Sequence, residues 1–124
     1  MKLADCKSED YDCIFFAGGF GTMWDFPDDK DVQRLTREMY ESKKIVAAVC
    51  HGPVALLNVV LSNGTHLVKG HDIAVFTNEE EDAMQRRTIV PFTCEDKLKE
   101  NGGFHKAAEN FKPCVAISGR ICTG

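Results

Sequence analysis

The sequence predicts an α/β fold with a doubly wound, mostly parallel sheet, and two observations support this. The run from Ile45 to Val49 is continuously apolar, which is typical of a strand covered on both faces in a parallel sheet. The chain then turns sharply at Gly52 and Pro53 and continues as an apolar helical run over residues 54–61. This succession of strand, turn and helix indicates an open α/β sheet.

Size, composition and charge narrow the class of protein. With 124 residues and a hydrophobic content of 44%, the chain is long enough to bury a hydrophobic core, and we expect a single domain over residues 1–124. The net charge of −4 gives no electrostatic reason to expect nucleic acid or an anionic membrane as partner. There is no signal-peptide pattern, and no apolar run approaches the roughly 20 residues that span a bilayer, so we expect a soluble cytoplasmic protein.

The chain has six cysteines, which we interpret as free thiols because the sequence lacks a secretory signal and a small, loop-rich composition. No pair has C-x-x-C spacing, and no His or Cys cluster has zinc-finger spacing. His66 and His71 could meet across a hairpin, but exposed hairpin histidines are usually not ligands, so no metal site is expected.

The first strand leads into a glycine-rich turn. Residues 1–10 predict a surface segment or a short helical turn, and residues 11–17 predict a buried strand. Gly18-Gly19-Phe20-Gly21-Thr22 follows, with a spacing unlike GxGxxG or a P-loop. Its backbone N–H groups could approach a ligand closely and stabilise an oxyanion, and a simple tight turn is the alternative.

Two apolar features separate this turn from the next strand. Residues 23–27, which include Trp24, predict an apolar loop that could wall a pocket or belong to the core. Residues 28–42 predict an amphipathic helix, capped by Asp28 or Asp29.

Cys50 is the strongest candidate for chemistry. It lies at the carboxyl end of the Ile45–Val49 strand, and the turn after it resembles the nucleophile elbow of hydrolases, with cysteine in place of serine. The unpaired N–H groups and positive dipole end of the next helix favour a thiolate. Cysteine can also be a small core residue, but that use needs neither an elbow nor the adjacent His51, so we favour catalysis.

The second half of the chain predicts several short elements. Ser62-Asn63-Gly64 ends the helix that begins at residue 54. The other expected elements are a hairpin over 66–76, an extended piece over 89–92, a helix over 93–101, a weakly helical or irregular segment over 104–110, a strand over 114–118 and, after a turn, residues 121–123.

Thr77 and Asn78 predict the cap of a further helix, whose first turn carries the acidic run Glu79–Asp82. Acids in a first turn stabilise the helix through its dipole, which is the simpler interpretation. Alternatively, one of these acids faces the cysteine and orients a histidine.

Taken together, these motifs resemble the ThiJ/PfpI superfamily, a branch of the class I glutamine-amidotransferase-like fold. The similarity is greatest to the branch of heat-shock chaperones that act as glutathione-independent glyoxalases. The motifs occur in the family's order over nearly the whole chain: Tyr11-Asp12, Gly18-Gly19, Gly21 to Asp25, Ala47 to Pro53, Lys69-Gly70, Phe76 to Glu81, Val90-Pro91-Phe92 and Arg120 to Gly124. The resemblance implies a flavodoxin-like sheet between helices.

The resemblance also implies residue roles. Cys50 would be the nucleophile, His51 its acid–base partner and Glu81 the acidic third member. The N–H groups of Gly19 and His51 would form the oxyanion site, beside the substrate-binding residues Gly18, Phe20 and Trp24. The substrate would be a 2-oxoaldehyde such as methylglyoxal and the product a 2-hydroxy acid such as lactate, without metal, nucleotide or glutathione.

Three departures from the family pattern matter. An acidic residue that hydrogen-bonds the nucleophile precedes the point where this chain starts, Phe20 stands where many relatives have histidine, and relatives continue beyond Gly124. We therefore expect an incomplete domain, truncated at both ends. Such a sheet would expose apolar surface, and we expect a homodimer.

Other functions compete with the glyoxalase. A stress chaperone or redox sensor would use an oxidisable Cys50 and an apolar patch that holds unfolded proteins, around Phe20, Trp24 and Phe26. A cysteine peptidase or amidase of the PfpI type ranks lower because it needs a peptide-sized cleft. Glutamine amidotransferase activity ranks lowest because the chain has no downstream His-x-Glu pair.

Overall fold

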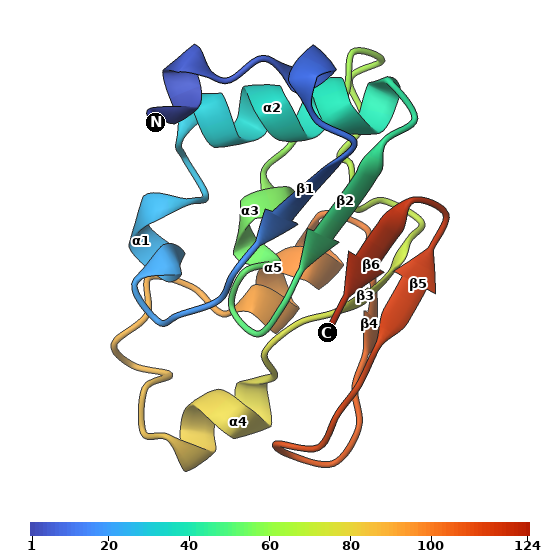
Figure 1. Cartoon of the computed structure of the whole chain (residues 1–124). Coiled ribbons are helices and arrows are strands. Elements are labelled where there is room, and N and C mark those ends of the chain that lie inside the picture. The colour runs from blue at the N-terminus through green and yellow to red at the C-terminus, as the bar shows by residue number, and fades with distance from the viewer.

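The computed structural model describes all residues from 1 to 124 and contains a four-stranded sheet in the order β1-β2-β6-β5. Its strands are β1 (Cys13–Phe16), β2 (Ile45–Ala48), β6 (Ile121–Thr123) and β5 (Ala116–Ser118). Strand β2 pairs in parallel with both β1 and β6, and β5 closes the edge antiparallel to β6 (Figure 1). The predicted α/β class, the mostly parallel sheet and the strands over 11–17, 45–49 and 114–118 are confirmed.

A second sheet joins β3 (Asp72–Ala74) to β4 (Phe104–Lys106) in parallel. The hairpin predicted over 66–76 is therefore wrong. The weakly helical or irregular segment predicted over 104–110 is wrong at residues 104–106, which form β4, whereas residues 107–110 are irregular as predicted. The partner of β3 comes from far along the chain, where no local turn signal could indicate it. Ile73 is fully buried, which shows that tertiary packing decides this pairing.

The helices are short except for one. They comprise two 3-10 turns (Leu3–Asp5 and Ser8–Asp10), α1 (Thr22–Asp25), α2 (Lys30–Glu41), α3 (Val54–Leu57), α4 (Asn78–Ala83) and α5 (Cys94–Glu100). The predicted helices over 28–42 and 93–101 are confirmed, as is the helical turn near the amino terminus.

Three local predictions differ from the structure. Helix α3 ends at Leu57 instead of continuing to residue 61, because Val59 leaves the helix and accepts a backbone hydrogen bond from Leu67. The loop expected over 23–27 is partly helical, because α1 spans Thr22–Asp25. The extended piece expected over 89–92 consists of turns and bends.

Side chains at two helix starts explain where those helices begin. Asp29 Oδ1 accepts hydrogen bonds from the N–H groups of Asp31 and Val32 at the start of α2, as predicted. At α4, Thr77 Oγ1 accepts from Glu80 N, and the Glu80 carboxylate accepts from Thr77 N, which completes a capping box. This cap fixes the direction of α4 and hence the position of its buried face.

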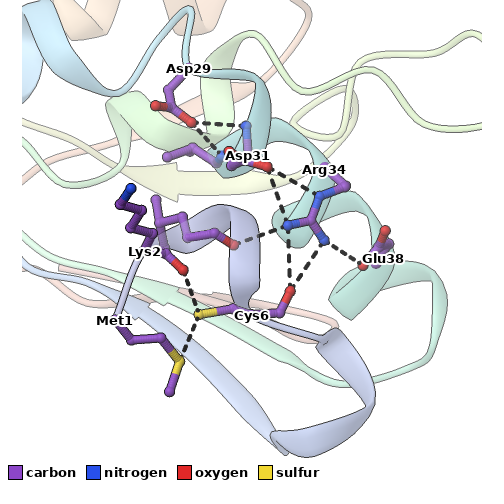
Figure 2. Close-up of polar contacts among 9 residues, drawn as sticks. Met1, Lys2, Cys6, Asp29, Asp31, Arg34 and Glu38 are labelled. Atoms are coloured by element: carbon purple, nitrogen blue, oxygen red, sulfur yellow. Dashed lines mark hydrogen bonds and ion pairs between the residues drawn. The ribbon is translucent and has the colours of Figure 1, made fainter.

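The amino-terminal segment is held onto α2 by one arginine. The Arg34 guanidinium donates to the carbonyl oxygens of Leu3 and Cys6, and it also pairs with Asp31 and Glu38 on its own helix (Figure 2). The first 3-10 turn is therefore tied to α2 through carbonyl groups, whereas in the second turn the Ser8 carbonyl accepts a hydrogen bond from Lys44 Nζ at 2.6 Å.

Helices cover only one face of the four-stranded sheet. In Figure 1, α3 and α5 lie behind the strands and no helix lies in front of them. The covered face carries core residues such as Val46, Ala48 and Ile121. The opposite face, here called the open sheet face, carries a row of paired residues across all four strands, Phe15, Ala47, Cys122 and Ile117.

The open sheet face is strongly exposed: Phe15 is 61% exposed and Ile117 is 72% exposed. The expectation that the Ile45–Val49 run is covered on both faces is therefore not met within this chain, whereas the expected exposure of apolar surface is met. No helix in the structure combines the length and the apolar character needed to cross a membrane.

Candidate active site

The backbone at Cys50 is strained and held from both sides. Cys50 has φ +61°, in the left-handed region that costs a non-glycine residue about 1–3 kcal/mol. Its N–H donates to Gly124 O at 2.7 Å, and its carbonyl accepts from Phe76 N at 3.3 Å. A Cβ at Gly52 would lie 2.3 Å from Phe16 O, so the turn requires glycine there. This is the sharp elbow that the sequence predicts, and the Cys50 side chain is exposed.

Cys50 and His51 form a polar pair, with Sγ 3.6 Å from Nδ1. The hydrogen bond with His51 lowers the pKa of the Cys50 thiol, against the opposing effects of partial burial and the Glu80 carboxylate. Burial favours neutral His51, but its hydrogen bonds with Cys50 and Glu81 outweigh this and raise its pKa. Both shifts favour a thiolate beside an imidazolium. Helix α3, whose dipole we expected to favour the thiolate, spans only Val54–Leu57.

Glu81 lies on the other side of the imidazole. His51 Nε2 donates to Glu81 Oε1 at 2.7 Å, and the Glu81 side chain is fully buried. The Phe76 ring stacks on the imidazole, with centroids 4.1 Å apart, and the Phe20 ring meets it edge-on at 5.9 Å. The imidazole is thus fixed by one carboxylate and two aromatic rings, with Nδ1 directed to the sulfur. The structure brings Cys50, His51 and Glu81 together in this order.

The glycine-rich turn packs directly against the elbow. A Cβ at Gly18 would lie 2.8 Å from the Cys50 Cβ, so only glycine allows this approach. Gly19 has φ +127°, and neither its N–H nor that of His51 donates to an oxygen or nitrogen acceptor in the chain, while the His51 N–H faces the Cys50 sulfur. Thr22 Oγ1 donates to Gly19 O at 2.7 Å, which fixes the turn. Two free amides beside a cysteine are suitable donors for an oxyanion.

The aromatic residues proposed from the sequence take different positions. The Phe20 ring contacts the His51 imidazole. The Trp24 ring packs against the Phe20 ring, with centroids 5.1 Å apart, and does not itself pack on His51. Arg86, which we did not consider, lies over the Phe20 ring at 4.4 Å. Neither the stacking of Phe76 on His51 nor the contact of Arg86 with Phe20 had a signal in the sequence pattern.

A cleft opens on another side of Cys50. It has a volume of about 480 Å³ and lies between Val49 and Cys50, the start of α4, and the segment from Ala107 to Val115. The sequence analysis missed it because the segment 107–115 is distant in the chain and has no regular structure.

No group of three or more His, Cys, Asp or Glu side chains is placed to hold a metal ion. His71 is engaged elsewhere, with Ser118 Oγ 2.8 Å from Nδ1 and Tyr40 OH 3.1 Å from Nε2. All six cysteines are free thiols.

Comparison with known proteins places this elbow in a family. The sequence pattern of the DJ-1/PfpI family matches residues 1–90. The chain belongs to the DJ-1/PfpI family. Among solved structures, the Rapid Encystment Protein 24 KDa of Francisella tularensis superposes with a TM-score of 0.96 at 35% identity, covering 99% of this chain and 55% of that protein.

Two curated relatives of this DJ-1/PfpI chain carry glyoxalase names. One, from Schizosaccharomyces pombe, is named probable glutathione-independent glyoxalase hsp3104; it is 33% identical over 99% of this chain and 58% of its own length. The other, Glyoxalase 3 of Candida albicans, is 38% identical over 99% of this chain and 55% of its own length. A crystal structure of glyoxalase III from Candida albicans superposes with a TM-score of 0.88. The chain thus spans about half the length of the relatives it matches.

Proposed function

We propose that the protein is a cysteine-dependent, glutathione-independent glyoxalase that converts a 2-oxoaldehyde such as methylglyoxal to a 2-hydroxy acid. The observation that carries this proposal is the alignment of the strained Cys50, His51 and Glu81 beside two free amides. The names of the relatives support the same reaction.

The first step uses the thiolate and the free amides. Cys50 Sγ adds to the aldehyde carbon, and the Gly19 and His51 N–H groups stabilise the oxyanion that forms. His51 Nδ1 then gives its proton to this oxygen, which yields a neutral hemithioacetal. Nδ1 is the nitrogen that moves protons, because Nε2 is held by Glu81 at 2.7 Å.

The second step moves a proton between adjacent carbons. Neutral His51 Nδ1 removes the proton from the sulfur-bound carbon and delivers it to the oxygen of the neighbouring carbon, which forms an enediol. Nδ1 then takes the hydroxyl proton of the sulfur-bound carbon and returns it to the neighbouring carbon. The first carbon is thereby oxidised to a thioester and the second reduced to an alcohol, so no external redox partner is needed. Water then hydrolyses the thioester, releasing the 2-hydroxy acid and the Cys50 thiol.

The test is conversion of methylglyoxal to lactate by the purified chain without glutathione. We expect Cys50→Ala to lose at least about 10³-fold in kcat, because the covalent route disappears. Cys13→Ala is the matched control, since Cys13 is also an exposed free thiol but lies away from the site on β1. Equal turnover by wild type and Cys50→Ala would refute the proposal.

A second candidate function rests on the open sheet face. Its exposed Phe15 and Ile117 could hold unfolded proteins, or could pair two copies of the chain into a homodimer. Suppression of client aggregation that survives Cys50→Ala but is lost in Phe15→Ser would support the chaperone, and a doubled mass in solution would support the dimer.

A further inference from the structure

The cleft beside Cys50 is far larger than methylglyoxal requires. The substituent of methylglyoxal is one methyl group, comparable to a water molecule with its share of about 30 Å³ in the liquid. The cleft has a volume of about 480 Å³, within the range of sites that hold drug-sized ligands. With a substrate as small as methylglyoxal, most of the cleft would remain empty or filled with water.

The walls of the cleft are mainly apolar. Its lining includes Val49, Phe76, Phe111, Pro113 and Val115. Apolar walls of this kind bind a hydrophobic substituent by removing its surface from water.

Two of the four charged residues that line the same space have partners, and the other two, Glu109 and Lys112, are exposed to solvent. Glu80 accepts from Thr77 N with one oxygen and from Phe111 N with the other, at 2.9 and 2.8 Å. Lys106 Nζ lies 3.6 Å from Asp72 Oδ2. A hydrophobic substituent would therefore not leave these groups without partners.

The cleft adjoins Cys50 on the side where a substituent must go. Gly18 and His51 flank Cys50 on the oxyanion side, and neither of them lines the cleft. Once sulfur is bonded to the aldehyde carbon, the substituent is carried by the next carbon along. Because the oxyanion is directed to the amides of Gly19 and His51, the cleft is the space left for this substituent.

We propose that this cleft binds the substituent of the substrate and that the preferred substrates are 2-oxoaldehydes with an aryl or long alkyl group, such as phenylglyoxal; this rests on the proposed glyoxalase function. Phe111 is the specificity-determining residue. Its ring lies 6.3 Å from that of Phe76, and its backbone is held at φ +61° with the N–H bonded to Glu80. Phe76 itself stacks on His51, so it is unsuited to a selective test.

The first experiment compares kcat/KM for phenylglyoxal and methylglyoxal in the wild type, Phe111→Ala and Phe104→Ala. Phe104 is the matched control because both rings are 59% exposed, but only Phe111 lines the cleft. The ratio of the two substrates within each protein is compared across the variants, so that intrinsic differences in carbonyl reactivity cancel. We expect Phe111→Ala to lower the phenylglyoxal-to-methylglyoxal ratio at least about tenfold, the lower end of what one methylene of pocket contact contributes to discrimination. Phe104→Ala should leave the ratio within twofold.

An unchanged ratio in Phe111→Ala would overturn the cleft proposal while leaving the glyoxalase function intact. A chain that turns over neither substrate would instead contradict the proposed function. In that case the cleft is tested by calorimetric binding of mandelate and lactate, the two products, to the Cys50→Ala chain. Mandelate should bind at least tenfold more tightly, and Phe111→Ala should abolish the difference. Equal binding of the two acids would overturn the proposal.

Discussion

Glu81→Gln removes one negative charge beside Nε2 of the His51 imidazole while keeping the shape of the side chain at position 81. In the native chain, Glu81 Oε1 accepts the His51 Nε2 proton at 2.7 Å in a fully buried position. The amide oxygen of glutamine can still accept this proton, but without the full charge. The variant therefore tests the electrostatic part of the contact separately from its geometry.

The magnitude follows from the kind of hydrogen bond. A hydrogen bond to a charged group contributes roughly 1.5–3 kcal/mol, and a neutral one about 0.5–1.5 kcal/mol. The imidazolium thus loses about 1–1.5 kcal/mol of stabilisation, close to the roughly 1.4 kcal/mol that changes an equilibrium tenfold. The thiolate–imidazolium form has the same net charge as the thiol–imidazole form, so their ratio should fall about tenfold.

The assay is the rate of Cys50 alkylation by iodoacetamide as a function of pH. Because the native pKa of Cys50 is lowered, the wild type should react rapidly in a window below the ordinary thiol pKa of about 8.5. In Glu81→Gln, reactivity within that window should fall by up to about tenfold and recover only as the pH approaches the ordinary thiol range. Glu79→Gln is the control, since Glu79 is exposed in the first turn of the same helix. Superimposable profiles for Glu81→Gln and wild type would refute the role of this carboxylate.

Three further outcomes are expected. Gly18→Ala should lower kcat at least about tenfold with little change in circular dichroism, because its Cβ would lie 2.8 Å from the Cys50 Cβ; unaltered kcat would contradict this packing. Hydrogen peroxide should oxidise Cys50 well before Cys94, because burial raises the pKa of the Cys94 thiol. Peptide mass spectrometry measures this order, and earlier oxidation of Cys94 would contradict the expectation. Arg34→Ala should speed proteolysis within residues 1–10 while costing less than about 1 kcal/mol in urea unfolding, and unchanged proteolysis would count against the anchoring.

Features set by neighbouring residues could be predicted from the sequence. The elbow depends on Gly52 and Pro53 directly after an apolar strand, and the cap of α4 depends on Thr77 and Glu80, three positions apart. Each of these signals lies within a few residues, so the pattern alone located Cys50 at a strand end. The choice of Glu81 among the four acids came instead from the family resemblance, and the structure places it 2.7 Å from His51 Nε2.

Features set by distant residues could not be predicted in the same way. The pairing of β3 with β4 joins Ile73 to His105, and an apolar run cannot show which distant strand it will meet. The same limit hid the cleft, whose wall at Phe111 comes from an irregular segment. The length of α3 was overestimated because Val59 is apolar and fully buried, as a helical core residue would be, yet it lies outside the helix.

Val49 and Val115 belong to two surfaces at once. Both line the cleft. Val49 follows β2 and Val115 precedes β5, and because side chains alternate along a strand, they lie on the same face as Ile45 and Ile117, the open sheet face. A molecule that packs on that face and shifts either valine will change the affinity of the cleft for its ligand. By thermodynamic reciprocity, the ligand will then change the affinity of the face for that molecule by the same factor. Binding of such a molecule to the sheet and binding of a ligand in the cleft would then be linked equilibria.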